Sequence, residues 1–143
     1  VLRGGVHLSR PSDWHIREAN NDPGRAFIQY ISPRALSFAL YERSDSPVDP
    51  WRDVMSRYEV DVSSVGAKIT GRGVPVATWK GEGRAYSVER KVDSAKRAFV
   101  GYSREVLLRG EHRVVLVQIV RQRGALADID DELMRVVSTL EVL

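Results

Sequence analysis

Residues 113–122, RVVLVQIVRQ, constrain the fold of this chain more than any other stretch. Side chains at alternate positions of a strand point to opposite faces of its sheet. Both faces of this stretch are apolar, with Val115, Val117 and Ile119 on one and Val114, Leu116 and Val120 on the other. A strand of this kind is usually central and covered on both sides. The sequence therefore predicts a sheet with residues 113–122 in its interior.

The other strand-like stretches form two groups on either side of a helical one. The first group comprises residues 6–9, 14–17, 25–31 and 35–42, with a turn predicted at 18–24. The second comprises residues 67–81, 83–92, 97–109 and 112–122, with turns predicted at 81–83, 93–96 and 110–112. These short connections favour an antiparallel meander. We expect GRG (71–73) and GEG (81–83) to be bulges or turns, because neither lies in the context of a phosphate-binding loop.

A helix is predicted over residues 51–65. Its apolar residues recur at the spacing of one helix face: Trp51, Val54, Met55, Tyr58 and Val62. Asp49 and Pro50 are typical of an N-cap and a first-turn residue. Gly66 is placed to end the helix.

A second helix is predicted within residues 125–140. Five apolar residues recur at helical spacing: Ile129, Leu133, Val136, Val137 and Leu140. Four acids stand near the start of this helix, where the helix dipole favours negative charge. Residues 141–143 could add a last short strand. Core positions are expected at Trp14, Trp51, Met55, Tyr58, Leu133, Val137 and Leu140.

Covering both faces of a central strand requires a helical layer on each side of the sheet. We therefore predict an α+β fold, a three-layer α/β/α sandwich with a central, mainly antiparallel twisted sheet. A length of 143 residues fits one domain, residues 1–143, with residues 1–5 as a linker.

Four stretches, in this order, resemble one known superfamily: VHLSRPSDW (6–14), the helix at 51–65, GVPVATWKGEGRAYSV (73–88) and VVSTLEVL (136–143). This PsbP/Mog-like superfamily joins PsbP of the photosystem oxygen-evolving complex, Ran-binding Mog proteins, DcrB envelope proteins and LpqN-type lipoproteins. The resemblance implies the same α/β/α fold. It also implies a protein that is not an enzyme, because members act as assembly factors, adaptors, small-protein binders or lipoproteins.

Composition excludes several kinds of chemistry. The chain has no cysteine, which excludes disulfides, thiolate nucleophiles and sulfur-ligated zinc. Its three histidines, His7, His15 and His112, show no metal-binding spacing. Asp13 and His15 lie near serines but lack a nucleophile elbow. We therefore predict no catalytic residue, no metal and no cofactor.

Charge is unevenly distributed along the chain. Residues 72–123 hold twelve basic and five acidic residues. Four cations, Arg90, Lys91, Lys96 and Arg97, stand around a predicted hairpin tip, and we expect this tip to be exposed and to contact a partner. The partner would be an acidic protein surface or a membrane surface, whereas nucleic acid is not expected without an array of stacking aromatics. The alternative is a solvated strand face with cross-strand pairs to Glu82, Glu89 and Glu105.

These observations favour a non-enzymatic binding or assembly-factor module that is bacterial and associated with the envelope or with a larger complex. A periplasmic or envelope location, as in a lipoprotein, is favoured over the cytoplasm. The alternative is a small-ligand-binding or enzymatic domain that uses a cavity between sheet and helices. A deep pocket with convergent polar groups would favour that alternative.

Overall fold

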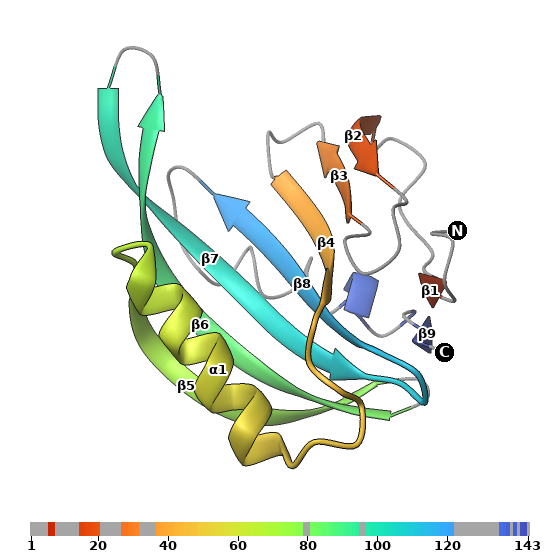
Figure 1. The fold of residues 1–143 in the computed structure, drawn as a ribbon. Helices are drawn as coiled ribbons and strands as arrows, with labels where there is room; N and C mark the ends of the chain where they lie inside the picture. Colours follow the sequence, from red (N-terminus) through yellow and green to blue (C-terminus); the bar gives the residue numbers. More distant parts are fainter. Residues whose placement is uncertain are drawn as a thin grey trace.

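The described residues form a curved antiparallel sheet with a long helix packed on it (Figure 1). The computed structural model describes residues 6–7, 15–20, 27–31, 37–78, 81–94, 97–121, 135–137, 139 and 141–142. Its elements are β1 (Val6–His7), β2 (His15–Asn20), β3 (Phe27–Ile31), β4 (Ser37–Arg43), α1 (Trp51–Ser64), β5 (Lys68–Thr78), β6 (Gly81–Ser94), β7 (Arg97–Arg109), β8 (Val114–Arg121) and β9 (Glu141–Val142).

Two meanders join to make the main sheet. Seven strands lie in the order β2-β3-β4-β8-β7-β6-β5, and every neighbouring pair is antiparallel. Helix α1 carries the chain from the middle of the sheet to its far edge, and β8 then returns to pair with both β4 and β7. The predicted meander and the interior position of residues 113–122 are thus confirmed. The short strands β1 and β9 pair separately.

Each face of the sheet carries its own hydrophobic cluster, as the two apolar faces of β8 require. Val114 and Leu116 pack with Val54, Tyr58 and Val62 of α1. The cluster on the opposite face holds the alternate β8 positions together with residues from other strands and from the C-terminal part: Val115, Val117, Ile119, Phe38, Leu40, Val106, Val136 and Val137. Both clusters exclude water from β8, which makes this strand the centre of the molecule.

The predicted three-layer sandwich is shown only in part. Helix α1 forms a layer on one face, while on the other face the described helical residues are 135–137, of which Val136 and Val137 are buried. The rest of the predicted second helix, with Leu133 and Leu140, lies outside the described residues, as does Trp14. What the structure shows is a sheet-dominated α+β fold.

The C-terminal end of α1 follows the predicted pattern. Gly66 has a φ of 73°, in the left-handed region that glycine adopts without strain. Its N–H binds the Ser63 carbonyl, and the Ala67 N–H binds the Val62 carbonyl, at 3.0 and 3.2 Å. This pair of bonds is the Schellman motif, which satisfies carbonyls left open at a helix end.

The predicted N-cap is wrong. Pro50 occupies the cap position, without a side-chain hydrogen bond, and Asp49 instead accepts a hydrogen bond from Arg57, eight residues further on. The helix start is held by its first residue, Trp51, whose ring lies between two guanidinium groups. Arg84 and Arg109 approach its centroid to 4.7 and 4.5 Å. Trp51 and Met55 are half-buried and pack against the hydrophobic cluster beneath α1.

Two predicted turns in the sheet need correction, and one predicted bulge is confirmed. Residues 18–20 belong to β2 instead of a turn. GRG (71–73) does lie at a bulge, where the β5 register shifts twice. GEG (81–83) lies in regular β6, where a Cβ on Gly83 would come within 2.6 Å of a β7 carbonyl oxygen. Glycine is needed there for close backbone approach instead of for a turn.

Strands β6 and β7 continue together beyond the strands on either side. Their ladder runs as far as the pair Ser94–Arg97, whereas β5 leaves β6 after Glu89 and β8 leaves β7 after Tyr102. Residues 90–94 and 97–101 thus form a two-stranded arm, which projects from the sheet in Figure 1. The predicted hairpin is confirmed by this pairing.

Candidate functional site

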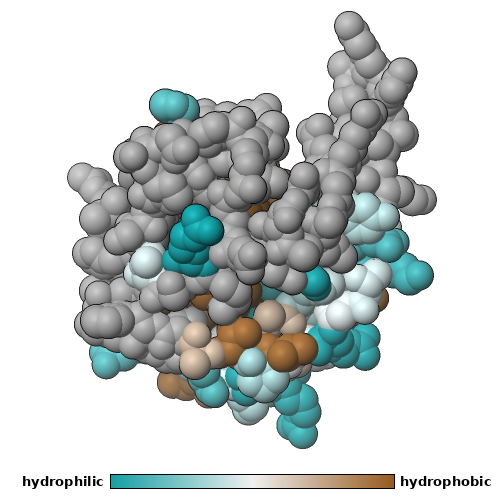
Figure 2. Space-filling model, turned by 180° about the vertical axis from the view of Figure 1, so that it is seen from behind, coloured by the Kyte–Doolittle hydropathy of each residue, from teal (hydrophilic) through white to brown (hydrophobic). Residues whose placement is uncertain are grey.

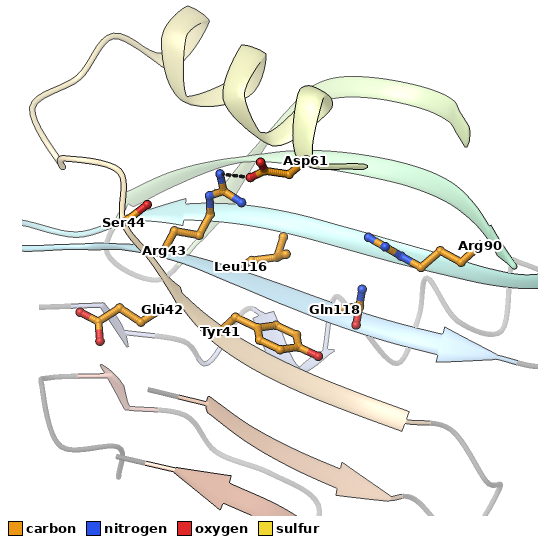
Figure 3. A pocket seen from close by; sticks show the side chains of 8 residues that line it. All are labelled: Tyr41, Glu42, Arg43, Ser44, Asp61, Arg90, Leu116 and Gln118. Atoms are coloured by element: carbon orange, nitrogen blue, oxygen red, sulfur yellow. Dashed lines mark hydrogen bonds and ion pairs between the residues drawn. The ribbon is translucent and has the colours of Figure 1, made fainter. Parts of the chain in front are cut away.

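An open hollow lies on the part of the sheet that α1 leaves uncovered. It has a volume of about 570 Å³ and is lined by Tyr41, Glu42, Arg43, Ser44, Asp61, Arg90, Leu116 and Gln118. Figure 3 shows Leu116 and Gln118 of β8 between Arg43 of β4 and Arg90 of β6, with Asp61 above them at the end of α1. Strands that are far apart in the sequence meet here because β8 lies between β4 and β7 and pairs with both. We refer to these eight residues as the hollow.

A buried carboxylate lies beneath the hollow. Glu105 of β7 is fully buried and sits between Gln118 and Tyr86 in the strand register. Tyr58 Oη donates to Oε1 over 2.8 Å, and Arg90 donates from Nε and Nη2 over 2.9 and 2.6 Å. Gln118 Nε2 donates over 3.2 Å, and the Ser103 hydroxyl donates as well. We refer to Tyr58, Arg90, Ser103, Glu105 and Gln118 as the Glu105 cluster.

The donors decide the ionisation of this carboxylate. Burial alone would raise the pKa of Glu105, but the hydrogen bonds and charge of Arg90, aided by Ser103 and Tyr58, outweigh it and lower the pKa. Burial and the neighbouring Glu105 charge raise the pKa of Tyr58, which therefore stays protonated and donates. Glu105 is an anion whose approximately four lone-pair sites are occupied.

A second ion network borders the hollow. Arg43 Nε binds Asp45 at 2.5 Å, and Arg57 Nε binds the other oxygen of Asp45 at 2.6 Å. The same Arg43 extends Nη2 to Asp61 at 3.0 Å, and its guanidinium lies 5.8 Å from the centroid of the Tyr58 ring. Because Tyr58 also binds Glu105, the two networks meet under the helix.

Asp45 and Asp61 differ in how firmly they are held. The Asp45 side chain is 2% exposed and accepts from two arginines, whereas the Asp61 side chain is 64% exposed. Burial would raise the pKa of Asp45, but the hydrogen bonds from Arg43 and Arg57 lower it. Asp45 is a fixed part of the fold, and Asp61 is a solvated counter-ion.

Of the four predicted contact residues, the structure describes the side chain of Arg90 alone. The expectation of exposure is wrong for Arg90, whose side chain is 22% exposed and bound to Glu105. Its position in the strand, rather than at the tip, explains the burial, since it pairs with Gly101 at the base of the arm. The side chains of Lys91 and Arg97, and all of Lys96, lie outside the described residues. Their role as a partner contact stays a prediction.

The alternative interpretation of Glu105 as one acid of a solvated strand face is wrong, because its side chain is buried. The signal that could have found it is alternation, because Ser103, Glu105 and Leu107 fall on one side of β7. A charge on a core-facing position needs buried partners. Three of these partners, Tyr58, Arg90 and Gln118, come from other elements, so sequence order did not reveal them.

The described residues contain no group of three or more His, Asp or Glu side chains that could hold a metal ion. His15 and His112 are both exposed. In the same part of the chain, no helix has the length and apolar character needed to cross a membrane.

Figure 2 shows the molecule from behind, on the face of the sheet opposite to the hollow. A small apolar area appears among hydrophilic residues on its described surface. Val74 of edge strand β5 is 59% exposed, and it shares the register of Ala85 and Val106 on this side of the sheet. The charged side chains and hydrogen-bond donors that converge on one place lie in the hollow, on the other face of the sheet.

No family model and no curated protein matches this chain in sequence. Solved structures match along nearly its whole length. Protein PA94 from Pseudomonas aeruginosa, of unknown function, is 14% identical with a TM-score of 0.64, over 98% of this chain and 99% of its own. Cyanobacterial PsbP (CyanoP) from Synechocystis sp. PCC 6803 is 15% identical with a TM-score of 0.59, over 97% and 87%.

A third similar structure is TplEi, an immunity protein of the type VI secretion system of Pseudomonas aeruginosa. It is 10% identical with a TM-score of 0.53, over 96% of this chain and 54% of its own. At such low identities the likeness shows the fold alone. The chain has a PsbP-like fold, as the sequence resemblance predicted.

Proposed function

We propose that this chain is a non-enzymatic binding module that holds a segment of a partner protein in the hollow. The observation that carries the proposal is a preformed, open depression with a rigid floor. Arg90 and Gln118 line the hollow and are both fixed from below by Glu105. Groups held in one geometry before binding lose less entropy when a partner arrives.

The chemistry of the buried acid favours binding over catalysis. A general base needs a free lone pair and a pKa near the working pH. Glu105 accepts five hydrogen bonds, and its pKa is lowered, away from neutrality. Its role is to position Arg90 and Gln118.

The openness of the hollow favours a protein over a small ligand. Sites for small molecules enclose most of the ligand surface. Here a small ligand would keep one side in water, because α1 borders the hollow on one side and the hollow is otherwise open to solvent. A polypeptide segment laid across β4 and β8 would cover the opening itself.

The arm extends this contact in the proposal. Arg90 stands where the hollow meets the arm, and the sequence places Lys91, Lys96 and Arg97 further along it. These cations would speed the encounter with an acidic partner. We further propose an envelope location for the bacterial protein, and subcellular fractionation of its native host tests that part.

Blocking the hollow tests the proposed function. Ser44 is exposed and lines the hollow, so Ser44→Trp would fill its mouth without disturbing the core. Ser63→Trp is the matched control, because Ser63 is an exposed serine of α1 outside the hollow. Native-host extracts passed over the tagged chains should yield a partner that the wild type and Ser63→Trp retain and Ser44→Trp loses. Equal recovery of every protein by all three chains would contradict the proposal.

A further inference from the structure

Two guanidinium groups face the hollow with unused donors. An arginine has five N–H donors. Within the described part of the chain, Arg43 uses Nε and Nη2 for Asp45 and Asp61, and Arg90 uses Nε and Nη2 for Glu105. These contacts within the described residues do not engage Nη1 of either arginine. The Gln118 amide, which also lines the hollow, lies between them in Figure 3.

Asp61 is the weakest member of the ion network. It lies in the last turn of α1, where the partial negative charge of the helix end repels a carboxylate. Its side chain is 64% exposed, against 13% for Arg43, so water competes with Arg43 for this carboxylate and weakens the pair. A carboxylate from outside could therefore take its place on Arg43 at little cost.

We infer that the hollow binds an acidic segment of a partner protein, and that a carboxylate of this segment replaces Asp61 as the outer partner of Arg43. The inference rests on the proposed function and names the chemistry of the partner. Asp45 keeps Arg43 in place during the exchange, because it is buried and bound to the other edge of the guanidinium. Arg90 offers a second point of contact across Leu116, whose side chain gives the hollow an apolar floor.

A carboxylate suits this site better than the headgroup of a lipid surface does. The hollow is a depression between α1 and β4, so a flat membrane would not reach its floor, whereas an extended segment can enter it. Planar guanidinium groups bind carboxylates and phosphates alike through two parallel hydrogen bonds, so it is access to the floor that favours the carboxylate. Vesicle binding serves as the competing outcome in the test below.

Removing Asp61 should strengthen binding of an acidic probe. The probe is an acetylated and amidated hexaglutamate peptide, titrated at low salt while the arginine Nε–H signals are followed by NMR. Asp61→Asn should tighten binding about two- to fivefold, which is the fold-change of an exposed ion pair. Asp53→Asn changes the net charge equally at the other end of α1, where the Asp53 side chain is 46% exposed, and should leave the affinity nearly unchanged. Equal affinities for the two variants would overturn the inference.

Removing Arg43 should abolish the same binding. Arg43→Gln should weaken the probe about tenfold or more, whereas Arg52→Gln, at an 88% exposed side chain, should not. Equal losses would indicate diffuse attraction and contradict a site. Phosphatidylglycerol vesicles that bind through Arg43 while hexaglutamate does not would also contradict the inference.

The outcomes separate this inference from the proposed function. Should Arg43→Gln fail to fold, the pair Asp61→Asn and Asp53→Asn still decides, because both changes are at exposed side chains. If Ser44→Trp blocks partner capture but Asp61→Asn does not tighten the probe, the hollow is the binding site and the acidic partner is wrong. If Ser44→Trp has no effect, the proposed function itself is wrong.

Discussion

Replacing Glu105 by Gln should destabilise the fold far more than an ordinary change of charge. The shape of the side chain is retained, but the carboxylate that accepts from Tyr58, Ser103, Gln118 and Arg90 is lost. The new amide N–H groups would face donors, and Arg90 would lose its counter-ion. Removing one partner of a buried ion pair costs about 3–5 kcal/mol. Because the Arg90 side chain keeps 22% of its exposure and can regain water, we expect about 3 kcal/mol.

Urea denaturation followed by circular dichroism measures this loss. Glu111→Gln is the matched control, since its side chain is 88% exposed and its loss should change stability by less than about 0.5 kcal/mol. Arg90→Gln completes a double-mutant cycle, and the coupling between the two positions should be about 2 kcal/mol. A loss below about 1 kcal/mol for Glu105→Gln, or a coupling near zero, would refute the idea that Glu105 fixes the floor of the hollow.

Three further predictions concern acid stability, backbone packing and the arm. The pKa of Glu105 is lowered in the folded chain, so its contribution to stability is complete above the ordinary glutamate value of 4.5 and is lost as the pH falls through the lowered value. Glu105→Gln should therefore show a shallower decline in the free energy of unfolding as the pH falls below about 4.5. Gly83→Ala should cost about 2 kcal/mol or more in thermal melts, because its Cβ would meet a β7 carbonyl oxygen, whereas Gly66→Ala, with open space around it, should cost only about 1 kcal/mol. Reversal of Lys96 and Arg97 to Glu should leave the melting temperature nearly unchanged and weaken partner capture at low salt, and unchanged capture would show a merely solvated tip.

The sheet could be predicted because its signals are local. Two apolar faces in residues 113–122 required a central strand, and Gly66 after an apolar helical face fixed the end of α1. Helix α1 begins at Trp51 as predicted, but its N-cap was missed because the restraint there is tertiary. Arg84 and Arg109 reach Trp51 from strands that come much later in the chain.

The hollow could not be predicted for the same reason. Arg43 and Asp61 are eighteen residues apart, and Tyr58 and Glu105 are forty-seven apart. Only the insertion of β8 beside β4 brings these groups together. A run of cations in the sequence predicted a surface cluster, but one of these cations, Arg90, binds the buried Glu105.

Site-specific crosslinking in the native host tests the central claim, that the hollow is the binding surface, most directly. A photo-reactive phenylalanine analogue would replace Tyr41, which lines the hollow, or Val60, which is 64% exposed on α1 outside it. The account predicts a discrete adduct with a partner protein from position 41 and none from position 60. An adduct from position 60 alone, or none from position 41 when the folded chain is present at its normal level, would contradict it.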